Sequence, residues 1–181
     1  MTKSLKTIII MLAIILVCGG LLAILSDLLF VSEQDRINRA IKEIYVGQEV
    51  GLNENETFNP TAYNESQENG VIKNAYKLTN GDYLVLSTGK KGYSNGTVTV
   101  YVAISVDGGV ATVKKVVENS YTAQTLMSKL SSYYDGFATL TANDVSQIAE
   151  MKVSGATGSS RAVNNAVITA LDYIQQMVIG G

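Results

Sequence analysis

Residues 97–117 read TVTVYVAISVDGGVATVKKVV, and the pattern in this segment indicates the class of fold. Residues 97–106 alternate with the period of two that places successive side chains on opposite faces of a strand. Asp107-Gly108-Gly109 supplies a turn, and residues 110–117 form a second apolar run. The segment therefore predicts an antiparallel hairpin with one apolar face that needs a cover. That face is expected to carry Val98, Val100, Val102, Ile104 and Val106.

Two shorter strands are expected before this hairpin. Residues 71–78 and 82–88 are short apolar-polar runs that meet at Asn80-Gly81, a dipeptide that favours a tight hairpin turn. Together with the later hairpin they predict a four-stranded antiparallel meander. Residues 48–70 are rich in Asn and Glu and contain the one proline, so we expect them to be mainly loop.

Helices are expected to cover the sheet. Residues 122–134 and about 143–150 have the pattern of short helices. The C-terminal segment is clearer, because its apolar residues recur at helical spacing and its polar residues fall on the opposite face. The apolar stripe consists of Ala162, Val163, Ala166, Val167, Ala170, Leu171, Ile174 and Val178, and the polar face carries Asn164, Asn165, Asp172, Gln175 and Gln176. The predicted class is α+β, a small antiparallel sheet covered by helices.

Three regions are expected along the chain. Residues 1–30 are interpreted as an N-terminal anchor with a transmembrane helix, residues 31–70 as a stalk helix and polar linker, and residues 71–181 as the folded domain. The stalk helix is expected to begin after Ser32, a capping hydroxyl followed by acidic residues, and to end at Gly47.

Nineteen uncharged residues from Thr7 to Leu25 predict the transmembrane helix. At 1.5 Å per residue they span roughly 28 Å, close to the thickness of the hydrocarbon core. A cleaved signal peptide and a lipoprotein modified at Cys18 are alternatives, but the apolar run is longer than a signal peptide needs and continues past Cys18. Lys3 and Lys6 favour a cytoplasmic N-terminus, although three basic residues at positions 36–42 count on the other side. We expect a single-pass protein of the plasma or inner membrane with its domain on the extracytoplasmic side.

The composition excludes several kinds of site. The chain has no histidine and a single cysteine, so it cannot build a Ser-His-Asp or Cys-His nucleophile, a histidine-ligated zinc or haem, or an internal disulfide. Its acidic residues lack EF-hand spacing, so we predict no metal site and assign no catalytic residue. With 16 acidic and 14 basic residues it lacks the electrostatic signature of nucleic-acid binding. Redox or transfer chemistry would need a bound group.

Residues 154–161, SGATGSSR, stand where the C-terminal helix is expected to begin. The first N–H groups of a helix have no partner within the helix and the helix dipole is positive there, so this geometry suits a phosphate. Gly155 and Gly158 permit close backbone approach, and Arg161 can add a charge-assisted hydrogen bond. The segment lacks the lysine of a Walker loop and is not a nucleophile elbow. From composition alone, a simple helix cap remains the alternative.

The tetrapeptide Ser154-Gly155-Ala156-Thr157 resembles the flavinylation motif of the FMN-binding domain family. The resemblance is to the component called G in the Rnf-type ion-translocating electron-transport complex and to the component called C in the sodium-translocating NADH:quinone reductase. In that family the motif reads Ser/Thr-Gly-Ala-Thr, and FMN is joined through its phosphate to the last threonine, which is Thr157 here. Gly92-Tyr93-Ser94, the strands that follow it and the N-terminal anchor and stalk occur in the family's order. The resemblance implies an FMN-binding domain at residues 71–181, with cofactor contacts from Ser154, Gly155, Ala156, Gly158, Ser159, Ser160, Tyr93 and Thr122.

The chain departs from the family pattern at two places. The family usually has an aspartate three residues before the motif, where this chain has Met151, and Glu150 stands one position earlier. The family's Glu-Thr-Pro-Gly-Leu segment, which lies by the flavin ring, corresponds to residues 121–125, YTAQT, where only Thr122 matches. The first departure concerns the attachment of the flavin, and the second concerns the contacts to its ring.

The resemblance implies a membrane-anchored electron-transfer subunit of an Rnf-type ferredoxin/NAD oxidoreductase complex that translocates ions. Its expected cofactor is covalent FMN. Its expected partners are the other integral-membrane subunits and the flavin transferase that attaches the cofactor. Two alternatives are a stand-alone flavinylated surface protein that transfers electrons outside the cell, and an anchored binding or scaffold domain that has kept the fold without flavin.

Overall fold

The computed structural model describes residues 11–21 and 31–180, and the chain divides into two compact units, Met1–Ile37 and Asn38–Gly181. In the first unit, residues 11–21 are helical and helix α2 (Glu33–Ile44) begins, with the Asp35 N–H donating a 3.1 Å hydrogen bond to Ser32 Oγ. This bond is the predicted cap. Within residues 11–21 and 31–180, no helix has the length and apolar character needed to cross a membrane. The span predicted at Thr7–Leu25 lies partly outside the described residues.

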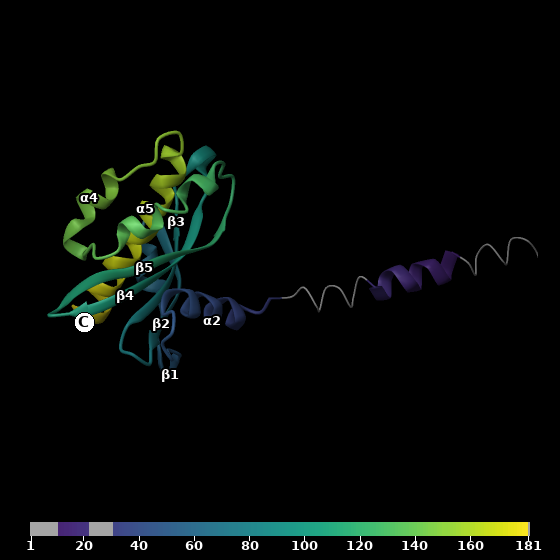
Figure 1. Cartoon of the computed structure of the whole chain (residues 1–181), viewed down its shortest axis with the longest axis horizontal. Coiled ribbons are helices and arrows are strands. Elements are labelled where there is room, and N and C mark those ends of the chain that lie inside the picture. Colours follow the sequence, from purple (N-terminus) through teal and green to yellow (C-terminus); the bar gives the residue numbers. More distant parts are fainter. Residues whose placement is uncertain (1–10, 22–30, 181) are drawn as a thin grey trace, which may run out of the picture. The chain divides into compact units, whose positions relative to one another are not determined.

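The second unit is built on one antiparallel sheet of five strands in the order β1-β2-β3-β4-β5, so each strand pairs with its neighbour in the sequence (Figure 1). The strands are β1 (Leu52–Thr57), β2 (Gly70–Leu78), β3 (Tyr83–Gly89), β4 (Val98–Asp107) and β5 (Val110–Tyr121). The α+β class and the meander of four strands are confirmed. The expectation of loop over residues 48–70 was wrong in part, because β1 and helix α3 (Thr61–Glu65) lie there.

The last two strands curl the sheet. The β4–β5 register shifts between Thr99 and Val100 and again between Ala103 and Ile104. Such irregularities bend a strand and increase its twist. β5 also continues four residues beyond the predicted end at residue 117, to Tyr121. This extension brings the segment after β5 to the loop before β4, where the Thr122 N–H donates to the Thr97 carbonyl oxygen at 2.9 Å.

Both faces of β4 are buried, whereas the sequence predicted one apolar face that needs a cover. Val100, Val102 and Ile104 belong to the same core cluster as helix α5. Tyr101 and Ala103, on the opposite face, are buried as well. On that side, the part of α2 after Asn38 supplies buried residues, and two hydrogen bonds join its end to the sheet. They run from Tyr45 Oη to Asp82 at 2.7 Å and from Lys115 Nζ to the Glu43 carbonyl oxygen at 3.1 Å.

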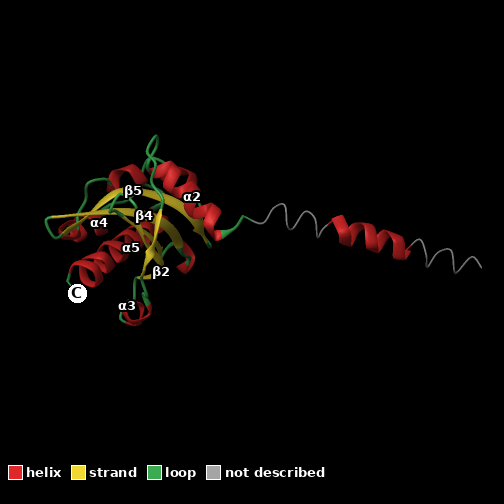
Figure 2. Cartoon of the chain, turned by 90° about the horizontal axis from the view of Figure 1, so that it is seen from below, coloured by secondary structure: helices red, strands yellow, loops and turns green. Residues whose placement is uncertain are grey.

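Helix α5 (Thr157–Ile174) lies along the other face of the sheet, and a π-helical turn (Gln175–Ile179) follows it (Figure 2). The predicted apolar stripe is buried from Ala162 to Ile174 and partly buried at Val178. Asn164 was predicted on the exposed polar face, and this was wrong. The residue is 1% exposed, because other segments pack against this side of α5. Its amide forms hydrogen bonds there with Tyr133 and Met151.

The two predicted short helices have different outcomes. Helix α4 (Val145–Glu150), preceded by a 3-10 turn (Ala142–Asp144), confirms the second. Residues 122–134 contain no α-helix. They hold a 3-10 turn (Met127–Leu130), and another (Tyr134–Phe137) follows. The buried residues of these turns recur every three or four positions, which is also the spacing of an amphipathic helix. They are Met127, Leu130, Tyr134 and Phe137. The left-handed backbone of Leu126, at φ 62°, prevents an α-helix from continuing through the segment.

Candidate functional site

Thr157 is the first residue of α5, and the turn before it is tightly held. Ala156 occupies the cap position, and Gly155 has φ +80°, a conformation that residues with a Cβ rarely adopt. Ser160 fixes this turn from inside the helix. Its buried hydroxyl donates to the Ala156 carbonyl oxygen at 3.0 Å and accepts from the Val153 N–H at 3.0 Å. The backbone that presents Thr157 is therefore set by the protein itself.

The four hydroxyl residues of the segment 154–160 lie in different environments. Ser159 and Ser160 are 1% and 0% exposed, and their hydroxyls already have protein partners. Ser154 and Thr157 are exposed. Of these four residues, Thr157 alone lines the pocket described next. A large reactant can therefore reach the Thr157 hydroxyl more readily than the two buried serines.

A pocket of about 470 Å³ lies beside Thr157. One side comes from the end of α4 and the residues after it, Ala149–Lys152, and the other from Thr157, Arg161 and Asn164 in α5. Met151 and Glu150, which stand at and next to the position of the family's usual aspartate, both line it. The sequence departure at this position is thus a change in the wall of the pocket.

Two partly buried hydrogen bonds fix the wall of this pocket. The Asn164 side-chain amide donates to the Met151 carbonyl oxygen at 2.8 Å, and the Tyr133 hydroxyl donates to Asn164 Oδ1 at 2.6 Å. Burial raises the pKa of Tyr133 from its ordinary value of 10.0 to about 12, although hydrogen bonds with Asn164 and Ser160 oppose the shift. Tyr133 therefore remains protonated and continues to donate at neutral pH.

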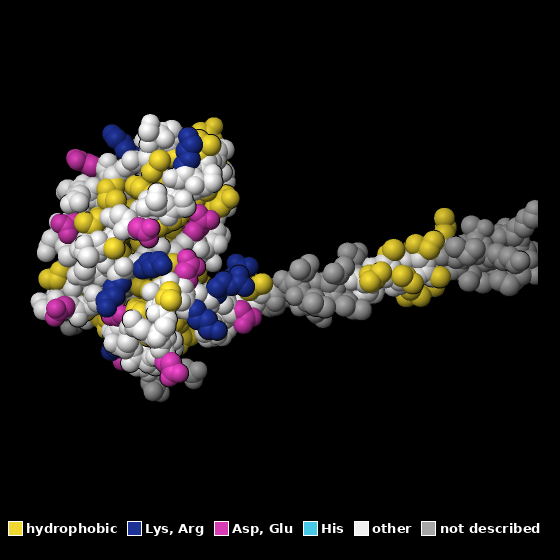
Figure 3. Space-filling model, in the orientation of Figure 1, with side chains coloured by type: hydrophobic (Ala, Val, Ile, Leu, Met, Phe, Trp, Pro, Cys, Tyr) yellow, Lys and Arg dark blue, Asp and Glu magenta, His cyan; other side chains and the backbone are white. Residues whose placement is uncertain are grey.

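Three cationic side chains from separate segments lie around Thr157. Lys152 and Arg161 line the pocket. Lys129, from the 3-10 turn Met127–Leu130, places its Nζ 3.3 Å from the position that a Cβ on Gly155 would occupy. In the part of the chain that the structure describes, none of the three forms an ion pair. On the face drawn in Figure 3, basic and acidic side chains are interspersed.

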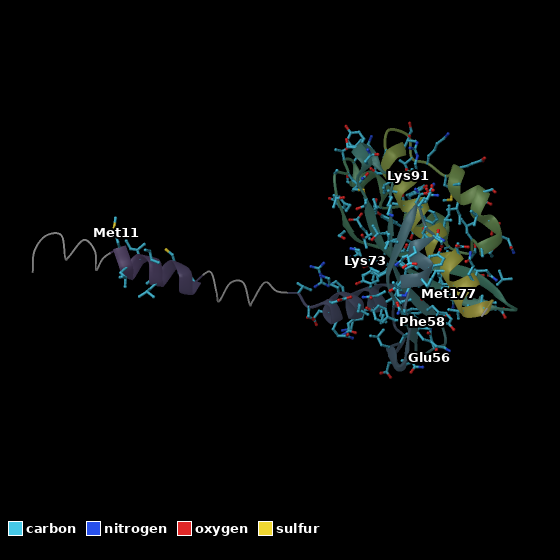
Figure 4. All side chains as sticks on the ribbon, turned by 180° about the vertical axis from the view of Figure 1, so that it is seen from behind. Met11, Glu56, Phe58, Lys73, Lys91 and Met177 are labelled. Atoms are coloured by element: carbon cyan, nitrogen blue, oxygen red, sulfur yellow. The ribbon has the colours of Figure 1, made fainter. Side chains whose placement is uncertain are left out.

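Tyr93 lies next to the start of α5 through a close backbone contact. A Cβ on Gly158 would lie 3.0 Å from both the nitrogen and the Cα of Tyr93, so glycine permits this approach. The Tyr93 side chain is 53% exposed. Figure 4 shows the neighbouring Lys91 near this end of α5, with Met177 near the other end. Tyr93 is therefore adjacent to Thr157 in space.

Thr122 belongs to a different part of the site. Its hydroxyl accepts a 3.1 Å hydrogen bond from the Thr97 N–H and lies 3.0 Å from the Thr97 hydroxyl. It does not line the Thr157 pocket. The predicted residues thus form two groups. The first, around the pocket and the helix start, is Ser154, Gly155, Ala156, Thr157, Gly158 and Ser160, and the second, around the loop before β4, is Tyr93, Thr122 and Ser159.

Sequence reasoning missed several residues of the site. Lys129 and Lys152 carried no motif, and Asn164 appeared to be an ordinary surface residue of a helix. Gln124 differs from the family's pattern in the segment 121–125, so the motif does not predict a role for it. Their positions depend on how distant segments pack, and that packing leaves no local pattern in the sequence.

The arrangement can bind an anion and attach it. The accessible Thr157 hydroxyl and the cations Lys152 and Arg161 line one pocket, and Lys129 lies beside Gly155 in the turn that leads into α5. The first N–H groups of a helix add donors that suit an anion. Among residues 11–21 and 31–180, no three Asp, Glu, Cys or His side chains cluster in a way that could hold a metal ion.

One family model matches part of this chain. The model of the FMN-binding domain family matches residues 92–172, from the loop before β4 through most of α5. The match includes the Thr157 pocket, Tyr93 and the segment 121–125. Strands β1–β3 lie outside it, although they belong to the same sheet. No curated protein and no solved structure matches the chain.

Proposed function

We propose that the FMN-binding domain at residues 92–172 carries its FMN as a phosphoester of Thr157 and that the chain serves as an electron carrier. The domain match supplies the ligand. The observation that carries the mode of attachment is the position of Thr157, an exposed, pocket-lining hydroxyl that ends a Ser-Gly-Ala-Thr motif at the start of α5. That motif resembles the family's flavinylation motif.

The surroundings of Thr157 suit a phosphodiester. Such a group keeps one negative charge, and a helix start with unpaired N–H groups stabilises negative charge. No side chain caps the first turn of α5 among the described residues, so phosphate oxygens can accept from its N–H groups. Lys129, Lys152 and Arg161 add cationic donors, whose hydrogen bonds to a phosphate are shorter and stronger than neutral ones.

The pocket has room for more than the phosphate. Small-molecule sites commonly have volumes of about 300–1,000 Å³, and this pocket, at about 470 Å³, is of that size. Its lining combines the apolar Met151 with polar and charged groups. The ribityl chain can hydrogen-bond to such groups while the phosphate remains at Thr157.

The attachment step forms one P–O bond. The Thr157 hydroxyl oxygen attacks the flavin phosphorus of a flavin dinucleotide donor, and the hydroxyl loses its proton. The bond between that phosphorus and the bridging oxygen of the diphosphate breaks, and a nucleoside monophosphate leaves. A flavin transferase supplies the donor and takes up that proton. We assign Glu150 the role of the family's aspartate, because it is the carboxylate that lines the pocket beside Met151.

The bound flavin supplies the redox chemistry, and the protein supplies position and electrostatics. An ester through the phosphate leaves the ring unaltered. The chain's own residues then have to bind the phosphate, orient the cofactor and limit its movement. None of these tasks requires a histidine, which is consistent with the composition.

We place this carrier in a membrane complex. The uncharged run at Thr7–Leu25, with Lys3 and Lys6 before it, supports an N-terminal anchor and a domain on the extracytoplasmic side. The resemblance to the G component of the Rnf-type complex supports integral-membrane subunits as partners and a role in ferredoxin- and NAD-linked ion translocation. In this proposal the anchor keeps the flavin near its partner subunits.

Attachment is tested on the full chain coexpressed with a flavin transferase. After denaturing electrophoresis, a covalent flavin gives fluorescence in the protein band. Thr157→Val, which removes the hydroxyl and keeps the side-chain volume, should abolish it, whereas Thr157→Ser should retain it in part. Thr61→Val is the matched control, since it makes the same change at an exposed threonine of α3, outside the site. Fluorescence that persists in Thr157→Val overturns the assignment.

The complex is tested by purification in mild detergent from the native membrane. Integral-membrane partners that copurify in constant ratio support the Rnf-type assignment. A flavinylated chain that purifies alone indicates the stand-alone electron-transfer protein. A colourless chain, even after coexpression with the transferase, indicates a binding or scaffold domain.

A further inference from the structure

Gln124 uses its whole side-chain amide to join three segments of the site. Its Oε1 accepts from the Tyr93 N–H at 3.1 Å and from the Ser159 hydroxyl at 2.8 Å. Its Nε2 donates to the Thr122 carbonyl oxygen at 3.1 Å and to the Tyr93 carbonyl oxygen at 3.4 Å. One amide thereby connects the loop before β4, the segment after β5 and the first turn of α5.

The loop that Gln124 holds is backbone-strained. Outside glycine, positive φ angles are found at Ser94 and Asn95 in this loop, at Lys91 directly before it, and at Ala123 and Leu126 near Gln124. Left-handed conformations of such residues cost energy and persist only where surrounding interactions enforce them. Four hydrogen bonds from one side chain are the kind of interaction that enforces them.

The Gln124 amide fits here because two neighbouring residues are glycines. A Cβ on Gly92 or on Gly96 would lie 2.5 Å from Gln124 Nε2. The amide therefore occupies a narrow slot between the loop and α5. The same loop places the Tyr93 backbone against Gly158, the residue that follows Thr157.

We propose that Gln124 is a positioning residue for the flavin: it holds the loop of residues 92–96 against the first turn of α5, so that the Tyr93 ring lies beside a cofactor attached at Thr157. This inference rests on the proposed function. Gln124 itself does not contact the flavin in this account. It acts through Tyr93, an exposed aromatic side chain that can stack on or edge a flat ring.

The first test uses the full chain without flavin and measures amide hydrogen exchange. The Tyr93 N–H has Gln124 Oε1 as its acceptor. Gln124→Ala should raise exchange at Tyr93 roughly two- to tenfold, the change for one lost hydrogen bond. Gln176→Ala, which alters a surface glutamine in the turn after α5, should leave that exchange unchanged. Equal exchange in all three proteins overturns the positioning role.

The second test uses the flavinylated chain and separates attachment from position. Fluorescence of the denatured chain measures how much flavin is attached, and fluorescence of the native chain reports quenching by a neighbouring aromatic ring. Gln124→Ala should keep the attached amount of wild type and lose the quenching. Tyr93→Leu should lose the same quenching, and the double variant should show no further change.

The outcomes distinguish the two proposals. Wild-type chain without fluorescence after denaturation overturns the proposed function, and this inference with it. If flavin is attached but its quenching is the same in wild type, Gln124→Ala and Tyr93→Leu, the inference alone is overturned. The same holds if the double variant loses quenching by the sum of the two single effects. If Gln124→Ala does not fold, Gln124→Glu serves instead, because it keeps both accepted hydrogen bonds and loses the two donated ones, and its quenching should be intermediate.

Discussion

The side-chain amide of Asn164 in α5 donates a 2.8 Å hydrogen bond to the carbonyl oxygen of Met151, thirteen residues earlier in the chain. Both residues line the pocket beside Thr157. Asn164 is 1% exposed, and its oxygen accepts from the Tyr133 hydroxyl. This buried amide therefore sets the distance between the end of α4 and the helix that carries Thr157.

Asn164→Ala should lower the free energy of unfolding by roughly 1–3 kcal/mol, because it leaves the half-buried Met151 carbonyl and Tyr133 hydroxyl without this partner. Denaturant unfolding of the full chain in detergent measures the change. Gln176→Ala is the control, since it removes one exposed hydrogen bond of the same kind of group. A loss no larger than that of the control would contradict the role of Asn164.

Lys129→Gln and Arg161→Gln should each slow flavin attachment roughly tenfold, the effect of one charge-assisted hydrogen bond to phosphate. The slowing should shrink as salt is added, because ions screen these exposed charges. Time courses of in-gel fluorescence with purified transferase measure the rates. Lys73→Gln, an exposed lysine of β2, is the control and should leave the rate unchanged. Equal rates in all three variants would show that the cations do not assist.

Met151→Asp should speed flavin attachment, because it restores the family's usual aspartate at a position that already lines the Thr157 pocket. Glu150→Gln should slow attachment in the wild-type background and have a smaller effect when Asp is present at 151. The same time courses measure both. If Glu150→Gln is without effect in either background, another residue performs the role that we assign to Glu150.

The domain should lose stability in alkaline solution, because several of its buried or half-buried tyrosines have raised pKa values. Burial raises the pKa of Tyr133 to about 12, and burial also raises the pKa of Tyr45, Tyr63 and Tyr134. A group whose pKa is higher in the folded state stabilises the fold fully below its unfolded pKa, here 10.0, and loses that contribution as the pH rises towards the folded value. Melting temperatures should therefore fall between about pH 10 and 12.

Tyr133→Phe isolates the share of one residue in this alkaline loss. It removes the ionisable group, so the melting temperature should depend less steeply on pH above 10 than in wild type. The variant should also be less stable at neutral pH, because Asn164 Oδ1 loses its donor. An unchanged pH dependence would show that Tyr133 is not one of the groups that titrate on unfolding.

Much of the sheet and of α5 was predictable because local pattern determines them. Alternation located β4, Asn80-Gly81 located the β2–β3 hairpin, and the stripe from Ala162 to Ile174 located the buried face of α5. β1 was not predictable from alternation, since its sequence LNENET is polar and it forms the edge of the sheet by pairing with β2. The buried second face of β4 depends on α2, which lies far away in the sequence.

The site was predictable only where it is a motif. The Ser-Gly-Ala-Thr tetrapeptide identified Thr157 and its turn, and the structure distinguishes the accessible hydroxyl of Thr157 from those of Ser159 and Ser160. Gln124, Lys129 and Asn164 come from segments whose proximity is a result of folding. Residues 122–134 were also predicted to be helical, whereas their backbone is irregular. Gln124 and Lys129 lie in this segment.

The ester at Thr157 is tested most directly by the mass of the mature protein from its own cell and of its tryptic fragment. Trypsin cleaves after Lys152 and Arg161 and so releases residues 153–161, VSGATGSSR. We predict that this fragment is heavier by the mass of FMN less one water, with fragment ions that locate the addition on Thr157. A fragment of unmodified mass, or an addition on one of its serines, would contradict the account.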